Sequence, residues 1–346
     1  MLKEKRRFED MLLYSVAAVS VIVLAFMFAS FALGAYAFTS PMLGGTSVRQ
    51  TTQYLPIFAF GIAVPIFFPF PLTIGEIFVA VWAIYLTFFV ILLMGPWSGL
   101  LNSLKKIKQD RTLAIYSNGA LTVAVAFPAM LMLAAAIEFL LNSVGIPVGS
   151  LPQQDPRGFF YQLSIAPLIE EFGFRLCFVG LAAFLISWGV TKSYHSLRAF
   201  WHPSNALSEA GIQTWRQAPL YLSIALSALI FGFAHYLYGG GWEVGKIVSA
   251  TVVGLFLAII YYTHGFPAAV ISHWGFDYFQ AAFLYFDDVR GLPDISNVSN
   301  FSQALLYSQT YETYLMVFSA FVIYAYFIYT IIQGRLHNRS AFKHRE

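Results

Sequence analysis

The segment 159–286 places six ionisable side chains inside long apolar stretches. At bilayer depth such groups cost a few kcal/mol each, so they usually face a cavity and serve a function. Together they supply three carboxylates, two imidazoles and one guanidinium, which can take a proton from water and stabilise an oxyanion. The six residues are Glu170, Glu171, Arg175, His235, His273 and Asp277.

The spacing of these residues predicts two pairs. Glu171 and Arg175 stand four residues apart in a helical segment, with the acidic residue first, which favours an ion pair on one face. Glu170 points about 100° away from Glu171, so its carboxylate is left without that partner. His273 and Asp277 are also four residues apart, and we expect Asp277 to accept a hydrogen bond from His273 and fix its ring.

Two ways of activating water fit this set of residues. In the first, Glu170, alone or with His235, takes a proton from water while His273 stabilises the oxyanion. In the second, Glu170, His235 and His273 hold a divalent metal such as Zn²⁺, which activates the water. Individual residues of the set could instead have a structural role. A lone histidine in an apolar helix is usually a core residue, and a buried ion pair can simply fix the position of a helix.

Membrane-spanning helices must hold these residues in place. The chain has 346 residues, of which 58% are hydrophobic and only 11% charged, with a mean hydropathy of +0.67. A soluble domain is roughly 45–50% apolar and about 25% charged. We therefore expect an all-α, polytopic membrane protein with a single domain, 1–346. The predicted eight transmembrane helices are 11–38, 75–97, 113–141, 159–190, 218–238, 245–263, 266–286 and 311–333.

The basic residues predict the orientation of this domain. An even number of spans puts both termini on one side, and a cytoplasmic N-terminus then places fifteen of the twenty Lys and Arg residues in inner segments. Both termini are therefore predicted to be cytoplasmic. The apolar segment 54–72 contains four prolines, so we expect it to be interfacial or re-entrant rather than a ninth span.

Composition also limits the partners. The net charge of +3 is modest and follows the topology, so we expect membrane lipid and no nucleic acid as partners. The single cysteine, Cys177, excludes a disulfide within the chain. The chain is expected to be a multi-pass protein of the plasma membrane or the endoplasmic reticulum.

Three motifs resemble those of a known family. The segment E-E-F-G-F-R resembles the signature E-E-x-x-x-R, F-G-F-A-H resembles F-x-x-x-H, and H-W-G-F-D resembles H-x-x-x-[N/D]. In this order they are similar to the CAAX protease and bacteriocin-processing (CPBP) family of intramembrane endopeptidases, of the Ras-converting CAAX protease type. The resemblance covers 159–286, which would be the catalytic core, and implies an α-helical, commonly eight-span fold. It also implies hydrolysis of a peptide bond near the C-terminus of a protein substrate, in the best-known branch after a prenylated cysteine.

The resemblance also implies roles for the motif residues. Glu170 would activate water with the help of His235. His273 and Asp277 would stabilise the oxyanion or position the water, and Glu171 and Arg175 would complete the first motif. The family is often called a metalloprotease family, so the metal alternative stays open.

This chain departs from the CAAX branch at one position, because that branch usually has Asn where this chain has Asp277. An ionised Asp cannot donate a hydrogen bond to an oxyanion, so Asp277 stays protonated, orients His273 or binds a metal. Two other classes of function compete with the endopeptidase. One is a non-catalytic immunity or scaffolding member of the same fold, and the other is a transporter that uses the intramembrane carboxylates.

Overall fold

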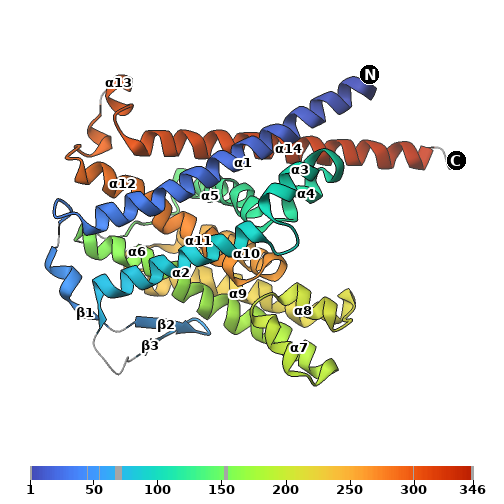
Figure 1. Cartoon of the computed structure of the whole chain (residues 1–346), viewed down its shortest axis with the longest axis horizontal. Coiled ribbons are helices and arrows are strands. Elements are labelled where there is room, and N and C mark those ends of the chain that lie inside the picture. Colours follow the sequence, from blue (N-terminus) through green and yellow to red (C-terminus); the bar gives the residue numbers. More distant parts are fainter. Residues whose placement is uncertain are drawn as a thin grey trace.

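The computed structural model is a bundle of long helices that lie side by side, with both termini at the same end (Figure 1). It describes residues 2–44, 46–53, 55–66, 72–151, 155–298 and 300–343. Within this part of the chain, seven helices are long and apolar enough to cross a membrane. The all-α, polytopic membrane fold is thereby confirmed. The seven are α1 (Leu2–Thr39), α2 (Ile74–Met94), α5 (Gly119–Ser143), the run Pro156–Thr191, α9 (Ala218–Tyr238), α10 (Val244–His264) and α14 (Ser308–Lys343).

The run Pro156–Thr191 consists of three continuous parts, α6 (Pro156–Glu171), the π-helix η2 (Phe172–Gly180) and α7 (Leu181–Thr191). Asp155 caps its start by accepting a hydrogen bond from the backbone N–H of Gly158 at 2.8 Å. Arg157 is fully buried and donates to backbone carbonyls at the end of α1, Phe38 among them. These contacts fix the helix that carries the first motif.

The predicted span 266–286 is the run α11 (Phe266–Trp274), η5 (Gly275–Phe279) and α12 (Gln280–Val289), in which η5 is a second π-helix. This run is not among the seven apolar helices, because polar residues such as His273, Asp277 and Gln280 lower its hydropathy. Every residue of α11 is buried. The eighth crossing therefore stays a prediction.

Aromatic packing anchors α11 in the centre of the bundle. Trp274 is completely buried and stacks on Phe31 of α1, with ring centroids 4.7 Å apart. It also stacks on Tyr278 of η5 at 5.1 Å and meets Phe89 of α2 edge to face. Because Trp274 directly follows His273, this stack sets the position of the second motif histidine.

Glycines bring α9 and α10 into close contact. A Cβ atom on Gly232 of α9 would collide with Thr251 of α10, and one on Gly254 of α10 would lie 2.9 Å from the ring of Phe231. Small residues at helix contacts allow such close approach in membrane bundles. The pair therefore forms a rigid wall beside the motif residues.

The segment 54–72 contains β-strands, which the all-α prediction missed. In its described part, β2 (Leu55–Ala59) and β3 (Ile62–Ile66) form an antiparallel hairpin, and β1 (Thr52–Gln53) pairs with β4 (Leu72–Thr73). Phe60 and Gly61 in the turn both have positive φ, as tight hairpin turns require. Tyr54 and residues 67–71 lie outside the described residues. The prolines prevent a continuous helix here, and backbone pairing between strands satisfies the polar groups instead.

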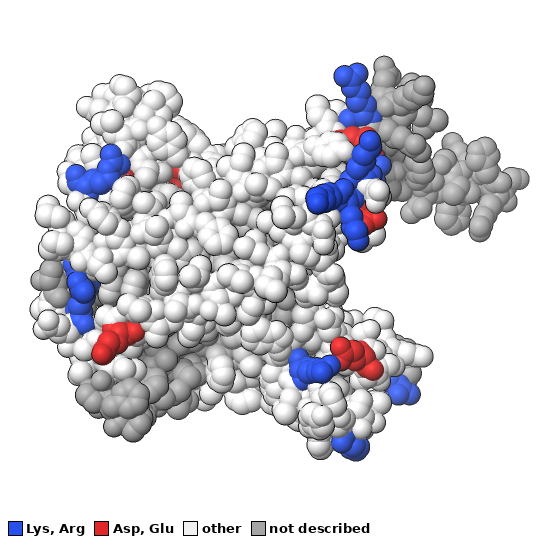
Figure 2. Space-filling model, viewed as in Figure 1, with Lys and Arg blue, Asp and Glu red and all other residues white. Residues whose placement is uncertain are grey.

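Shorter elements occupy the ends of the bundle, and basic side chains gather at the end that holds both termini (Figure 2). There Arg111 pairs with Glu9 and Asp10 of α1 at 2.8 and 3.0 Å. This charge distribution is the one that the positive-inside rule predicts for a cytoplasmic end. The shorter elements are η1 (Thr46–Gln50), α3 (Leu100–Asp110), α4 (Thr112–Tyr116), η3 (Tyr194–Phe200), α8 (Pro203–Glu209), η4 (Thr214–Gln217), η6 (Ile295–Asn297) and α13 (Phe301–Ala304).

Candidate active site

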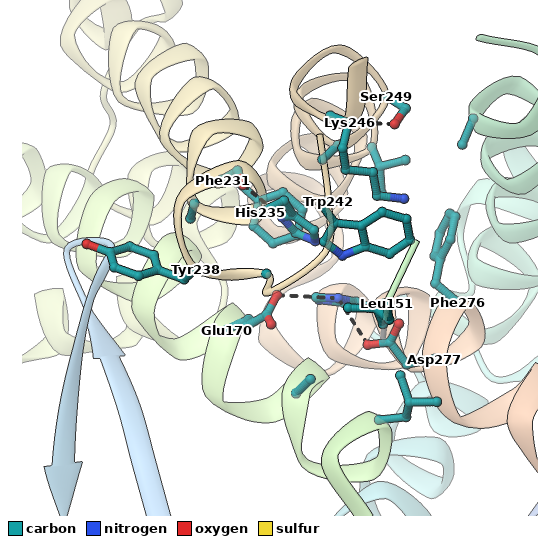
Figure 3. Close-up of a pocket in the computed structure, with 18 of the residues that line it drawn as sticks. Leu151, Glu170, Phe231, His235, Tyr238, Trp242, Lys246, Ser249, Phe276 and Asp277 are labelled. Atoms are coloured by element: carbon teal, nitrogen blue, oxygen red, sulfur yellow. Dashed lines mark hydrogen bonds and ion pairs between the residues drawn. The ribbon is translucent and has the colours of Figure 1, made fainter. Parts of the chain in front are cut away.

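A cavity of about 610 Å³ lies between α5, α6, α9, α10 and the α11–η5 run. Four of the six predicted site residues line it, namely Glu170, His235, His273 and Asp277. Its walls are otherwise mostly apolar, with Phe231 and Phe276 among them (Figure 3). This combination of an apolar pocket and a few converging polar groups is typical of a binding or catalytic site.

Both helices that carry the ionisable motifs change their winding at the site. α6 becomes the π-helix η2 directly after Glu171, and α11 becomes η5 directly after Trp274. Short π-helical segments interrupt α-helices frequently at functional sites. In the first motif Gly173 has no room for a Cβ atom, because Phe58 of the hairpin lies against it. The hairpin thus closes the cavity wall next to Glu170.

A buried chain of three residues holds the imidazole of His273. Its Nδ1 lies 2.8 Å from Oε1 of Glu171, and Oε2 of Glu171 lies 3.0 Å from Nε of Arg175. The side chains of Glu171 and Arg175 are both completely buried. Arg175 also lies over the ring of Phe231, 4.3 Å from its centroid. The predicted pair of Glu171 and Arg175 is present, although its atoms are not aligned as a hydrogen bond.

The prediction for Asp277 was wrong in one respect. We expected Asp277 to fix the ring of His273, but Glu171 accepts the Nδ1–H, since Glu171 comes from the neighbouring helix at the level of that nitrogen. Asp277 faces the other nitrogen, with Oδ2 3.5 Å from Nε2. Glu170 lies on the same side, with Oε2 3.8 Å from Nε2 (Figure 3). Nε2 of His273 therefore points into the space between two carboxylates.

His235 is held by its own helix. Its Nδ1 lies 2.9 Å from the carbonyl oxygen of Phe231, one turn earlier, and so donates a hydrogen bond to it. In the neutral ring Nε2 is then unprotonated and able to accept a hydrogen bond. In the described part of the chain no hydrogen bond joins His235 to Glu170, although both line the same cavity. A molecule bound between them would be needed to connect the two.

The predicted metal site finds no support in this geometry. Among the described residues, no three His, Cys, Asp or Glu side chains are arranged to hold a metal ion together. Nδ1 of His235 faces a backbone carbonyl and Nδ1 of His273 faces Glu171, so only Nε2 of each ring could bind a metal ion. Glu170, His235 and His273 thus share a cavity without forming a ligand set.

Lys246 also lines the cavity and was not predicted to belong to the site. Its Nζ lies 2.8 Å from Oε1 of Glu138 and 4.0 Å from the centroid of the Trp242 ring. The sequence carries one signal for it, because Lys246, Ser249, Ala250 and Val253 follow the spacing of a helix face. All four line the cavity.

Two loops at the end of the bundle opposite the termini contribute to the lining of the cavity. Leu151 lies between α5 and α6, and Gly239 to Trp242 lie between α9 and α10. Backbone hydrogen bonds join the loops, from Ser150 N–H to the Gly241 carbonyl at 3.1 Å and from Glu243 N–H to the Val148 carbonyl at 2.9 Å.

Comparison with known families gives one match. Residues 152–279 match the family described as type II CAAX prenyl endopeptidase Rce1-like. The matched region contains all six predicted site residues. The same comparison found no match among curated proteins or solved structures.

Proposed function

Because residues 152–279 belong to the CAAX protease (CPBP) family, we propose that this multi-pass membrane protein is an intramembrane endopeptidase that cleaves near the C-terminus of protein substrates. One observation carries the proposal. Glu170, His235 and Nε2 of His273 face a single cavity, and a buried carboxylate holds His273 in that orientation. A scaffold or a transporter would not require this arrangement.

In the proposed reaction Glu170 is the general base. Its carboxylate lies in the cavity with no hydrogen-bonded partner among the described residues, so it is free to accept a proton from water. The unprotonated Nε2 of His235 accepts the second hydrogen of that water and orients it. The hydroxide formed attacks the carbonyl carbon of the scissile bond. The proton on Glu170 then passes to the leaving amine as the carbon–nitrogen bond breaks.

His273 supplies the hydrogen bond to the oxyanion. With Nδ1–H donating to Glu171, the imidazolium form donates from Nε2 into the cavity. Three carboxylates and one guanidinium surround the ring, so a positive charge on His273 is compensated. Asp277 then stabilises this charge and does not contact the oxyanion. This role is compatible with Asp at a position where the CAAX branch usually has Asn. No step in this scheme passes through a metal ion.

Cleavage of C-terminal peptides by detergent-purified protein tests the proposal. A panel of prenylated and unprenylated peptides is incubated with wild type and with Glu170→Gln, and the products are identified by mass spectrometry. Glu209→Gln is the matched control, because Glu209 is an exposed residue that pairs with Arg198 far from the cavity. We expect Glu170→Gln to abolish cleavage and Glu209→Gln to leave it unchanged. Cleavage by Glu170→Gln at the wild-type rate would refute the assignment.

The orientation of the chain can be tested separately. With cytoplasmic termini, the loops that join α5 to α6 and α9 to α10 lie on the opposite side of the membrane. The only cysteine is Cys177, so a Cys177→Ser background permits labelling of single introduced cysteines. An impermeant maleimide should label Val144→Cys, which directly follows α5 and is 70% exposed, in intact cells. It should not label Leu197→Cys, which is 56% exposed at the other end, and the reverse pattern would contradict the topology.

A further inference from the structure

The catalytic cavity contains a cation that the proposed reaction does not use. Among the described residues that line the cavity, Lys246 is the only Lys or Arg. Its side chain is only 18% exposed. Figure 3 shows it extending from α10 toward the indole of Trp242, which also lines the cavity. An ammonium group placed in a mostly apolar pocket favours an anionic ligand.

The surroundings hold Lys246 in a fixed position and leave it able to bind. Glu138 accepts hydrogen bonds from Lys246 and from Ser249 on the same oxygen, each at 2.8 Å. The indole of Trp242 covers one side of the ammonium group. An ammonium group has three N–H donors, and Glu138 takes only one of them. The remaining donors can therefore bind an anion that enters the cavity.

Lys246 lines the same cavity as Glu170 and His273. Farther along the same helix, the carbonyl oxygen of Gly254 lies 3.5 Å from Nη2 of Arg175. Arg175 belongs to the buried ion pair with Glu171. Gly254 stands eight positions after Lys246 on α10, which corresponds to a rise of about 12 Å along the helix axis. An extended peptide covers this distance with about three to four residues. The length of α10 that borders the site is therefore of the size of a short C-terminal peptide.

We propose that Lys246 binds the terminal carboxylate of the substrate, so that its distance from Glu170 determines which peptide bond is cleaved. This inference rests on the proposed endopeptidase function. The C-terminal segment would lie extended in the cavity, with its carboxylate on the ammonium group and the scissile bond at Glu170 and His273. Glu138 acts as a positioning residue, because it holds Lys246 and compensates its charge while the cavity is empty.

The test compares two peptides of identical sequence that end in a carboxylate or in an amide. The full-length purified protein is used as wild type, Lys246→Gln, Lys246→Arg and the control Lys108→Gln, which changes an exposed lysine on α3. A charge-assisted hydrogen bond predicts that wild type and Lys108→Gln prefer the acid by about 10- to 100-fold in kcat/KM. Lys246→Gln should lose this preference and cleave the amide as wild type does. Lys246→Arg should keep part of it.

A second measurement needs only wild type. Peptides extended by one, two and three residues beyond the scissile bond move the carboxylate away from Lys246, so the preference for the acid should fall toward one. An equal loss on acid and amide in Lys246→Gln, or an acid preference that does not depend on length, would overturn the inference. In either case cleavage that still requires Glu170 leaves the proposed function intact. An absence of cleavage by wild type would instead contradict the proposed function.

Discussion

Replacing Glu171 by Gln tests the buried chain that connects Arg175 to His273. The substitution keeps the size of the side chain and removes its charge. Arg175 then lacks a counter-charge while completely buried. Removing one partner of a buried ion pair costs about 3–5 kcal/mol. We therefore expect a clear fall in the thermal midpoint of the purified protein.

The same substitution should reduce catalysis, because His273 loses the carboxylate that accepts its Nδ1–H at 2.8 Å. Loss of a supporting hydrogen bond to a catalytic or metal-bound histidine costs about 10- to 100-fold, and loss of the charge of an orienting carboxylate about 10⁴-fold. We expect kcat for peptide cleavage to fall by about 10²- to 10⁴-fold. The rate is measured at a substrate concentration above KM and at a temperature well below the unfolding temperature.

Two further variants separate the effects on stability and on catalysis. Glu170→Gln should lose activity and keep the wild-type thermal midpoint, because no hydrogen bond depends on Glu170 within the described residues. The double variant Glu171→Gln/Arg175→Met removes both buried charges, so it should regain stability while remaining inactive. A Glu171→Gln protein with wild-type kcat, or a double variant with restored kcat, would refute the proposed orientation of His273.

Asp277→Asn should keep at least about a tenth of the wild-type kcat, since Asn also fits beside Nε2 of His273, whereas Asp277→Leu should be inactive. Peptide cleavage is measured for both variants, and an inactive Asp277→Asn protein would show that the carboxylate itself is essential. Gly173→Ala should displace the hairpin at Phe58, lower kcat/KM and accelerate proteolysis of the hairpin. Gly189→Ala is the control, because a Cβ atom there meets no neighbour. His202 lies outside the spans, and burial together with the neighbouring His264 lowers its pKa to about 4. Between about pH 6.5 and 4 the unfolded state binds a proton that the folded state does not, so the free energy of unfolding should fall by up to about 3 kcal/mol as the pH falls. A His202→Gln protein should show a smaller fall over this interval in thermal unfolding, and an unchanged pH dependence would contradict the assignment.

The sequence was sufficient to predict the seven long apolar helices and to single out six candidate site residues, because both follow from local information. Long apolar runs can cross a bilayer only as helices, and ionisable residues within them stand out. The pairing of Glu171 with Arg175 was also predicted, since both residues lie on one helix. Four of the six residues indeed line one cavity.

Contacts between distant segments could not be predicted in this way. The partner of His273 Nδ1 is Glu171, which lies 102 residues earlier in the chain. The hairpin of β2 and β3 depends on strand pairing and on its contact with Gly173, and the prolines indicated only that no helix would span there. Lys246 stands at the start of the predicted span 245–263 and was not singled out, because its approach to Glu138 depends on how α5 and α10 pack.

The π-helix that follows Glu171 has a consequence for sequence alignment. A π-helical turn closes its hydrogen bonds five residues back rather than four, so it contains one residue more than an α-helical turn. Deleting one residue between Phe172 and Gly180 would convert this turn into α-helix without rotating the flanking helices relative to each other. A relative that shows a one-residue gap there would therefore keep the same face of the helix toward the cavity, whereas the same gap elsewhere in α6 or α7 would turn that face away by about 100°.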